Sequence, residues 1–131
     1  METPTQIGKR RILIADDNAM LRRALQMVLQ LWGFEVTVAE DGSAALAAAR
    51  GGQHAAIVMD IRMPEMDGLE VARRIRADPT SSAVLLLALS GSGEPEDRSA
   101  ALAAGFDHHL VKPVDSDLLR NLLNSAPAPN I

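Results

Sequence analysis

Arg11-Ile12-Leu13-Ile14-Ala15-Asp16-Asp17 is the stretch of sequence that decides the fold of this chain. Its apolar residues run without interruption instead of alternating with polar ones, which is typical of a strand covered on both faces. Two acidic residues follow where the apolar run ends. The stretch therefore predicts a central strand of a parallel sheet, with an acidic pair at its carboxyl edge.

The remaining sequence alternates between strand-like runs and helix-like stripes. Further strands are expected at 35–39, 55–59, 84–89 and 109–111. Helices are expected at 21–32 before Gly33, from the cap Asp41 to Gly51-Gly52, after the cap Asp67, from Pro95 to Gly105, and at 116–124. Five strand-helix repeats predict an α/β fold: a five-stranded parallel sheet, doubly wound as (βα)5 and flavodoxin-like, with right-handed crossovers.

Polar side chains stand at the ends of four of these strands. Asp16-Asp17 follows the first strand, Asp60 the third, Ser90 the fourth and Lys112 the fifth. The carboxyl ends of parallel strands share one rim, and open α/β sheets place their ligands there. Acids, a hydroxyl and an ammonium group are therefore expected to converge, a combination that suits a divalent cation together with a phosphoryl group.

The three acidic side chains predict a metal. Carboxylates crowded within about 5 Å repel each other by roughly 3 kcal/mol per pair at an effective dielectric constant near 20, so a cation is needed to offset them. Oxygen ligands without histidine or cysteine select Mg²⁺, or Mn²⁺, over zinc. Met63 and Met66 are expected to make packing or loop contacts, because thioethers do not suit such a hard site.

Asp60 is the predicted nucleophile, whose carboxylate attacks a phosphoryl group and becomes an acyl phosphate. The metal, the Ser90 hydroxyl and the Lys112 ammonium can each take one phosphoryl oxygen. Gly91, directly after the hydroxyl, leaves space that a larger side chain would fill. Each of these residues has a simpler interpretation when taken alone, as a cap, a loop acid or a solvated strand end. Their joint placement favours the phosphoryl site.

Composition limits the remaining possibilities. A chain of 131 residues with 47% apolar residues fits one domain, expected at 10–124, with an extension at 1–9 and a flexible tail or linker start at 125–131. The net charge of −4 shows no nucleic-acid footprint, and Lys9-Arg10-Arg11 is expected to be a solvated strand entrance. Direct binding to nucleic acid is therefore not expected.

The chain shows no sign of secretion or membrane insertion. It has no cysteine, and its N-terminus lacks the basic-then-apolar build of a signal peptide. The longest apolar stretch, 83–89, falls far below the roughly 18 residues that span a bilayer. We expect a soluble cytoplasmic protein that makes no membrane contact.

The chain resembles the receiver domains of two-component response regulators over nearly its whole length. The resemblance rests on Asp16-Asp17-Asn18, on 60–68 (DIRMPEMDG), on Ser90-Gly91, and on Ala104-Gly105-Phe106-Asp107 through Lys112-Pro113. It implies a phospho-accepting switch in which Asp60 takes a phosphoryl group from the phosphohistidine of a histidine kinase or phosphotransfer protein. It also implies that Asp17 and Asp60 ligate Mg²⁺ directly, Asp16 through water, and Arg62 through its backbone carbonyl.

The resemblance also implies how the signal is passed on. Ser90 is expected to move toward the phosphoryl group while the residue three before Lys112 turns inward. This movement remodels the face of the fourth helix, the fifth strand and the last helix for a downstream protein. That residue is His109, where the family usually has Tyr or Phe. Either its charge near neutral pH couples the output to acidity, or it is a half-exposed strand residue with weak coupling.

Two further residues have open interpretations. Arg62 either lies over the phosphoryl group and obstructs the attacking water, or points into solvent. His54 is expected in a surface loop.

Two other functional classes stay open at this stage. A haloacid-dehalogenase-type phosphatase also uses a nucleophilic aspartate, but it needs an acid two residues later, where this chain has Arg62. A pseudo-receiver would only bind partners. We expect limited autodephosphorylation and no small-molecule turnover. Met1 favours a natural single-domain start, whereas the Ala-Pro tail leaves open an excised piece of a hybrid kinase or larger regulator.

Overall fold

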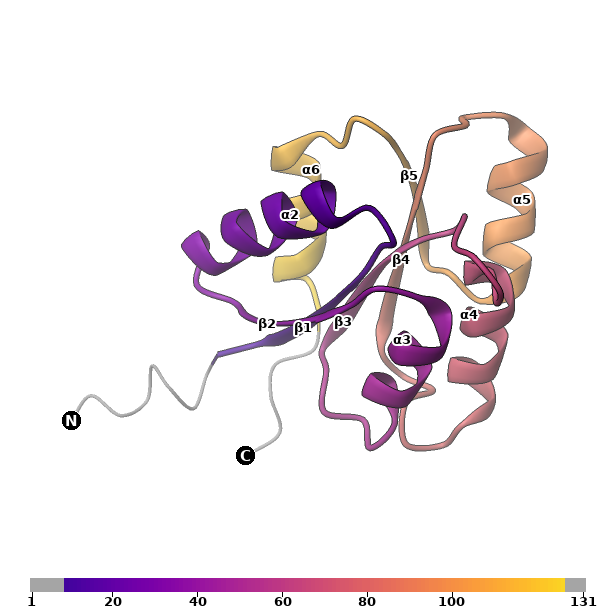
Figure 1. The fold of residues 1–131 in the computed structure, drawn as a ribbon, viewed down its shortest axis with the longest axis horizontal. Helices are drawn as coiled ribbons and strands as arrows, with labels where there is room; N and C mark the ends of the chain where they lie inside the picture. The colour runs from indigo at the N-terminus through magenta and orange to yellow at the C-terminus, as the bar shows by residue number, and fades with distance from the viewer. Residues whose placement is uncertain (1–8, 127–131) are drawn as a thin grey trace.

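A computed structural model describes residues 9–126, so most of the expected extension (1–9) and tail (125–131) lies outside the described residues (Figure 1). Within them, strands and helices alternate along the chain. The elements are β1 (Arg11–Ala15), α2 (Ala19–Leu31), β2 (Glu35–Ala39), α3 (Gly42–Ala49), β3 (Ala56–Asp60), α4 (Gly68–Ala77), β4 (Leu85–Ser90), α5 (Pro95–Ala104), β5 (His108–Val111) and α6 (Ser116–Asn124).

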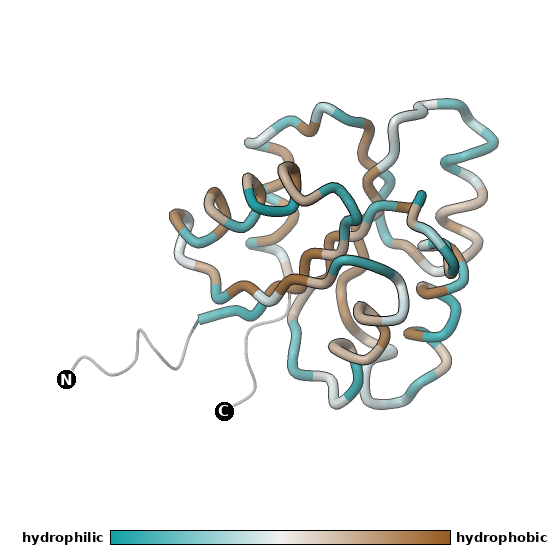
Figure 2. Tube along the Cα trace, in the orientation of Figure 1, coloured by the Kyte–Doolittle hydropathy of each residue, from teal (hydrophilic) through white to brown (hydrophobic). Residues whose placement is uncertain are grey.

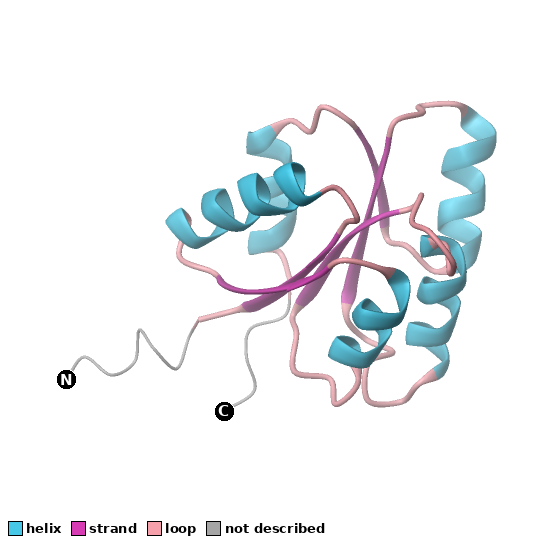
Figure 3. Cartoon of the chain, in the orientation of Figure 1, coloured by secondary structure: helices cyan, strands magenta, loops and turns pink. Residues whose placement is uncertain are grey.

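The strands form one parallel sheet in the order β2-β1-β3-β4-β5. Helices α2 and α6 cover one face and α3, α4 and α5 cover the other (Figures 1 and 3). On the first face, the Arg120 guanidinium carbon lies 5.4 Å from the centre of the Trp32 ring, which joins α6 to the end of α2. The predicted doubly wound, flavodoxin-like α/β fold is confirmed.

Burial on both faces explains the uninterrupted apolar runs. In β1, Leu13 and Ala15 pack under α3, α4 and α5, whereas Ile12 and Ile14 pack under α2 and α6. Every residue of β3 is buried. Figure 2 shows the hydrophobic stretches gathered along the central strands. Because neither side of a central strand meets water, no position in it favours a polar residue until the strand reaches the rim.

Local signals in the sequence set most helix ends. The side chains of Asn18, Asp41, Asp67 and Asp115 accept hydrogen bonds from backbone N–H groups of the first turns of α2, α3, α4 and α6. Helix α5 instead starts with Pro95 and ends at Gly105, whose φ of 117° suits a residue without a side chain.

Strand ends differ from the predictions by one residue, and the difference affects the site. Asp60 and Ser90 are the last residues of β3 and β4 instead of the first residues beyond them. Asp60 pairs with Leu89 and Ser90 with Val111, so both polar residues are held in the ladder. The sheet itself therefore fixes their backbones.

Other expectations can now be compared with the structure. Met63 is buried and Met66 packs against the same core cluster, as predicted. His54 lies in a loop, as predicted, but it is half-buried instead of exposed, and its Nδ1 is buried without a hydrogen-bond partner among the described residues. Ala126, assigned to the tail, is buried, and its carbonyl accepts a hydrogen bond from Arg10 Nε at 3.1 Å. Among the described residues, every helix is too short or too polar to cross a membrane.

Candidate functional site

Three carboxylates meet at the carboxyl edge of the sheet. Asp16 and Asp17 follow β1, and Asp60 ends the neighbouring strand β3. One oxygen from each side chain lies within 4.8 Å of the others. Asp16 and Asp60 are 0% and 7% exposed, whereas Asp17 is open to solvent. The predicted acidic cluster is therefore present, with one open side.

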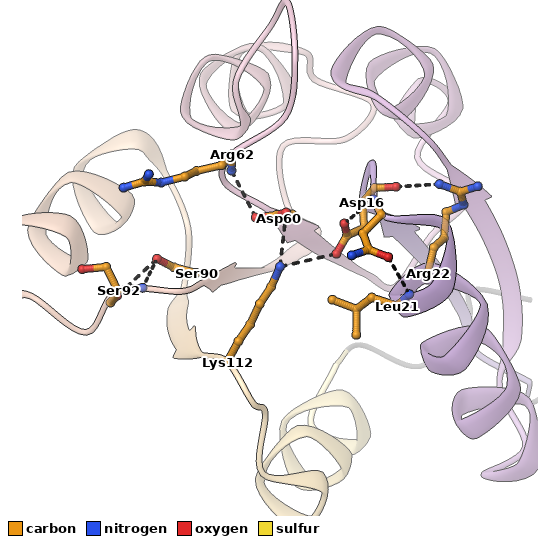
Figure 4. Close-up of polar contacts among 9 residues, drawn as sticks. Asp16, Leu21, Arg22, Asp60, Arg62, Ser90, Ser92 and Lys112 are labelled. Carbon is orange, nitrogen blue, oxygen red and sulfur yellow. Dashed lines mark hydrogen bonds and ion pairs between the residues drawn. The ribbon is translucent and has the colours of Figure 1, made fainter.

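The turn between β1 and α2 holds Asp16 firmly. Its backbone N–H donates to the Ala39 carbonyl at 3.1 Å, and its Oδ1 accepts the Asn18 N–H at 2.9 Å. Its own carbonyl accepts a hydrogen bond from Arg22 Nη1 at 2.8 Å (Figure 4). The Asp16 carboxylate consequently has a fixed direction.

The second oxygen of Asp16 is the strongest indication of a cation site. Within residues 9–126, Oδ2 is buried without a hydrogen-bond partner, and its nearest cation is Lys112 Nζ at 3.7 Å. Burial raises the pKa of Asp16 above its usual range, and the Asp60 and Asp17 charges raise it further, against the lowering effects of the Asn18 N–H and Lys112. An unpaired buried carboxylate oxygen beside two other carboxylates fits a hard divalent cation such as Mg²⁺.

Lys112 crosses the sheet edge to reach these acids. Its backbone N–H donates to the Ser90 carbonyl at 2.8 Å, which anchors the residue just after β5. Its ammonium lies 3.2 Å from Asp60 Oδ2 (Figure 4). The predicted meeting of Lys112 with Asp60 is thus observed, although β4 separates their strands.

The loop after β3 folds tightly around Asp60. Asp60 Oδ1 accepts the Arg62 N–H at 3.1 Å, and the Gly68 N–H donates to the Ile61 carbonyl at 2.8 Å. A Cβ on Gly68 would lie 2.8 Å from the Asp60 carbonyl oxygen, so a side chain does not fit there. The Arg62 side chain is exposed and extends away from the Asp60 carboxylate (Figure 4).

Ser90 lies at the same edge but faces its own loop. Its hydroxyl is buried, donates to the Ser92 carbonyl at 3.2 Å and accepts the Ser92 N–H at 3.1 Å (Figure 4). No hydrogen bond joins it to Asp60 among residues 9–126. Next to it, a Cβ on Gly91 would meet no atom within 4 Å, so the space beside Gly91 is open.

Comparison with known proteins agrees with this geometry. Residues 12–124 match the family model described as the response regulator receiver domain. The chain belongs to this family. It is 40% identical over 109 residues to the transcriptional regulatory protein PrrA of Mycobacterium tuberculosis, covering 83% of this chain and 46% of the relative. The chain thus spans less than half the length of the first curated relatives that it matches.

Solved receiver domains have the same fold. The receiver domain of sensor histidine kinase PA1611 from Pseudomonas aeruginosa, described with a magnesium ion coordinated in its active site cleft, superposes with a TM-score of 0.82 at 32% identity, covering 88% of this chain and 95% of that one. The receiver domain of Ssk1 from Saccharomyces cerevisiae, solved with the phosphotransfer protein Ypd1, gives a TM-score of 0.81 at 26% identity, covering 89% and 88%.

Membership of the family gives the site its general role. Receiver domains act in two-component signalling as switches and not as enzymes on small molecules. The cluster of Asp16, Asp17 and Asp60 fits the magnesium site of such a domain.

His109 is buried, although one of its two interpretations from the sequence placed it half-exposed. It is 9% exposed in β5, opposite Ala88 of β4, and its Nε2 is buried without a hydrogen-bond partner in the part of the chain that the structure describes. The half-exposed interpretation was wrong because the helices α3, α4 and α5 cover the side of the sheet to which Ala88 belongs.

Sequence reasoning did not single out two residues that shape the site, Arg22 and Ser92. Arg22 acts through a backbone carbonyl, and Ser92 through its own backbone groups. A side chain that bonds to backbone groups does not require a particular residue type at its partner position, so the sequence contains no pattern that would reveal the contact. The three-dimensional structure is needed to identify Arg22 and Ser92.

Proposed function

We propose that this receiver domain accepts a phosphoryl group on Asp60 in a Mg²⁺-dependent transfer from a phosphohistidine. The observation that carries the proposal is the contact of Lys112 Nζ with Asp60 Oδ2 at 3.2 Å, beside two further carboxylates. A carboxylate paired with an ammonium and facing a cation site has the parts that phosphoryl transfer needs. The comparison with PA1611 supports Mg²⁺ as the metal. Mn²⁺ would be a substitute because it also takes oxygen ligands.

In the proposed transfer, a carboxylate oxygen of Asp60 attacks phosphorus in line with the leaving imidazole nitrogen. The new O–P bond forms as the N–P bond breaks, and the imidazole leaves with the electron pair and takes up a proton. Bound Mg²⁺, held by Asp17, Asp60 and the Arg62 carbonyl, with Asp16 acting through water, would neutralise charge on the carboxylates and on one phosphoryl oxygen.

Two side chains would then stabilise the transferred group. The Lys112 ammonium, already next to Asp60, would pair with one phosphoryl oxygen. The Ser90 hydroxyl would donate to another after giving up its two hydrogen bonds with Ser92. The open space beside Gly91 leaves room for the group.

Transfer partner and output are proposed from the relatives and from the surface of the domain. The Ypd1–Ssk1 complex supports a phosphohistidine-bearing kinase or phosphotransfer protein as the donor. Ser90 and His109 would pass the signal to the face formed by α5, β5 and α6, where a downstream protein binds. We propose that the receiver unit, 10–124, acts in the cytoplasm without binding nucleic acid itself. The relative PrrA, a transcriptional regulatory protein, is longer than this chain, which covers 46% of it.

The lifetime of the phosphorylated state is expected not to depend on the Arg62 side chain. This side chain is exposed and points away from Asp60, so it does not lie over the position of the phosphoryl group. Limited autodephosphorylation should therefore proceed at the same rate in wild type and Arg62→Ala. A clearly faster loss of phosphate from the variant would show that Arg62 swings over the site.

Intact mass spectrometry tests the proposed function. Wild type incubated with acetyl phosphate and Mg²⁺, or with a phosphorylated histidine kinase domain, should gain one phosphoryl adduct. Asp60→Asn and wild type in EDTA are the controls, and both should stay unmodified. If neither donor modifies the wild type, the domain is a pseudo-receiver that only binds partners.

A further inference from the structure

Arg22 makes an unusual contact for a residue in the first turns of α2. Its side chain is half-buried and turns back toward β1, where Nη1 donates to the backbone carbonyl of Asp16 at 2.8 Å (Figure 4). That carbonyl belongs to the peptide bond that joins Asp16 to Asp17. One guanidinium therefore holds the peptide plane between two carboxylates of the acidic cluster.

The two carboxylates depend on this peptide plane to different degrees. Asp16 is also fixed by the Ala39 carbonyl and the Asn18 N–H. The Asp17 side chain is exposed and has no hydrogen bond or ion pair to any residue in 9–126. Because no side-chain contact within residues 9–126 holds Asp17, its backbone alone fixes where its Cα–Cβ bond starts and which way this bond points, and Arg22 holds the preceding peptide.

We infer that Arg22 is a positioning residue for the cation site, acting by orienting Asp17 through the Asp16–Asp17 peptide. This inference rests on the proposed function, in which Asp17 is a direct metal ligand. Residues that orient metal ligands typically change metal affinity by about 10- to 100-fold when they are removed. Loss of this single tie should weaken Mg²⁺ binding by about tenfold, at the lower end of that range.

The charge of Arg22 should weaken metal binding, whereas its hydrogen bond to the Asp16 carbonyl should strengthen it. A guanidinium near three carboxylates repels an incoming cation, so loss of its charge alone would strengthen metal binding. The sign of the change in affinity therefore separates the two roles. Positioning predicts weaker binding without Arg22, and simple electrostatics predicts tighter binding.

The experiment compares four variants of the full chain. Arg22→Met removes the donor and the charge, Arg22→Gln keeps an N–H donor without the charge, and Arg22→Lys keeps both. Arg23→Met is the matched control, because Arg23 is the exposed neighbour on α2 and makes no hydrogen bond or ion pair within residues 9–126. Mg²⁺ affinity is measured by calorimetry and Mn²⁺ affinity by electron paramagnetic resonance. Thermal midpoints in EDTA report on folding.

Binding to Arg22→Met should be about tenfold weaker for both ions, with most of the affinity restored in Arg22→Lys and no change in Arg23→Met. The amide signals of residues 16–18 should broaden in nuclear magnetic resonance spectra of Arg22→Met. Unchanged or tighter binding to a folded Arg22→Met protein would overturn the inference, as would an equal loss in Arg23→Met. If wild type itself binds neither ion, the proposed function fails instead.

Discussion

Replacing Asp16 by Asn should make the metal-free domain more stable while it weakens the cation site. Asp16 is fully buried, and its Oδ2 has no hydrogen-bond partner among residues 9–126. The amide of Asn can still accept the Asn18 N–H through its oxygen, which preserves the turn. The substitution therefore removes a buried negative charge without removing the hydrogen bond that holds it.

The size of the gain follows from the burial of Asp16 and from the charges around it. With oxygens no more than 4.8 Å apart, the Asp60 carboxylate repels Asp16 by about 3 kcal/mol at an effective dielectric constant near 20, and the exposed Asp17 carboxylate repels it by less because solvent screens it. Lys112 Nζ at 3.7 Å offsets about 4 to 5 kcal/mol of this repulsion. These charge effects nearly cancel, so the gain comes from burial, which is the largest cause of the raised pKa of Asp16. A buried polar group left without a partner costs about 1 to 3 kcal/mol, and about 2 kcal/mol corresponds to about 8 °C in thermal midpoint for a domain of this size.

Thermal unfolding in EDTA and in excess Mg²⁺ measures both halves of the prediction. In EDTA, Asp16→Asn should unfold at a higher temperature than wild type, and Asp17→Asn should show a smaller gain because solvent screens its exposed charge. Mg²⁺ at 100 times its dissociation constant would stabilise wild type by about 2.7 kcal/mol, which removes the advantage of the variant. An Asp16→Asn protein that is less stable than wild type in EDTA would refute this electrostatic argument.

Three other changes test other parts of the structure. Arg76 donates to the carbonyls of Gly105 and Val84 and to the Asp107 carboxylate. Arg76→Met should therefore lower the free energy of unfolding, measured in urea, by about 2 to 3 kcal/mol. A loss below about 0.5 kcal/mol would contradict this role. His109→Phe removes a buried nitrogen without a partner and should raise stability by about 1 kcal/mol, whereas a drop would mean that the pocket rejects the larger ring. Burial, followed by the Arg11 charge, lowers the pKa of His54, so its contribution to stability is complete above the unfolded pKa of about 6.5 and declines as pH falls below it. His54→Gln should therefore flatten the fall in urea midpoint between about pH 7 and about pH 5, and an equally steep fall would assign it to other groups.

The sequence predicted the sheet and the meeting of charged groups because both follow from simple geometry. Uninterrupted apolar runs such as 12–15 belong to strands covered on both faces, and parallel strands bring their ends to one edge. Asp60 and Lys112 could thus be placed together although 52 positions separate them. Their roles in transfer remain proposals that the mass experiment tests.

Orientation within the site could not be predicted in the same way. Ser90 bonds to Ser92, two positions along the chain, because a short hydroxyl side chain readily pairs with nearby backbone groups. His109 and His54 were placed too close to solvent, since an imidazole has no strong preference for either side of a strand end. The hydrogen bond from Arg22 to the Asp16 carbonyl could not be predicted from the sequence either, because any long donor at position 22 could make it.

The charges in the site impose an order on the proposed transfer. Three carboxylates and one ammonium give the centre a net charge of −2, from three negative charges and one positive charge. A phosphoryl group, itself anionic, would be repelled by this centre, and Lys112 would have to leave Asp16 and Asp60 unpaired in order to reach it. A divalent cation cancels the remaining charge and takes over the carboxylates that Lys112 now holds. Cation binding should therefore precede phosphoryl transfer, because only then is the ammonium free to pair with the incoming oxygen.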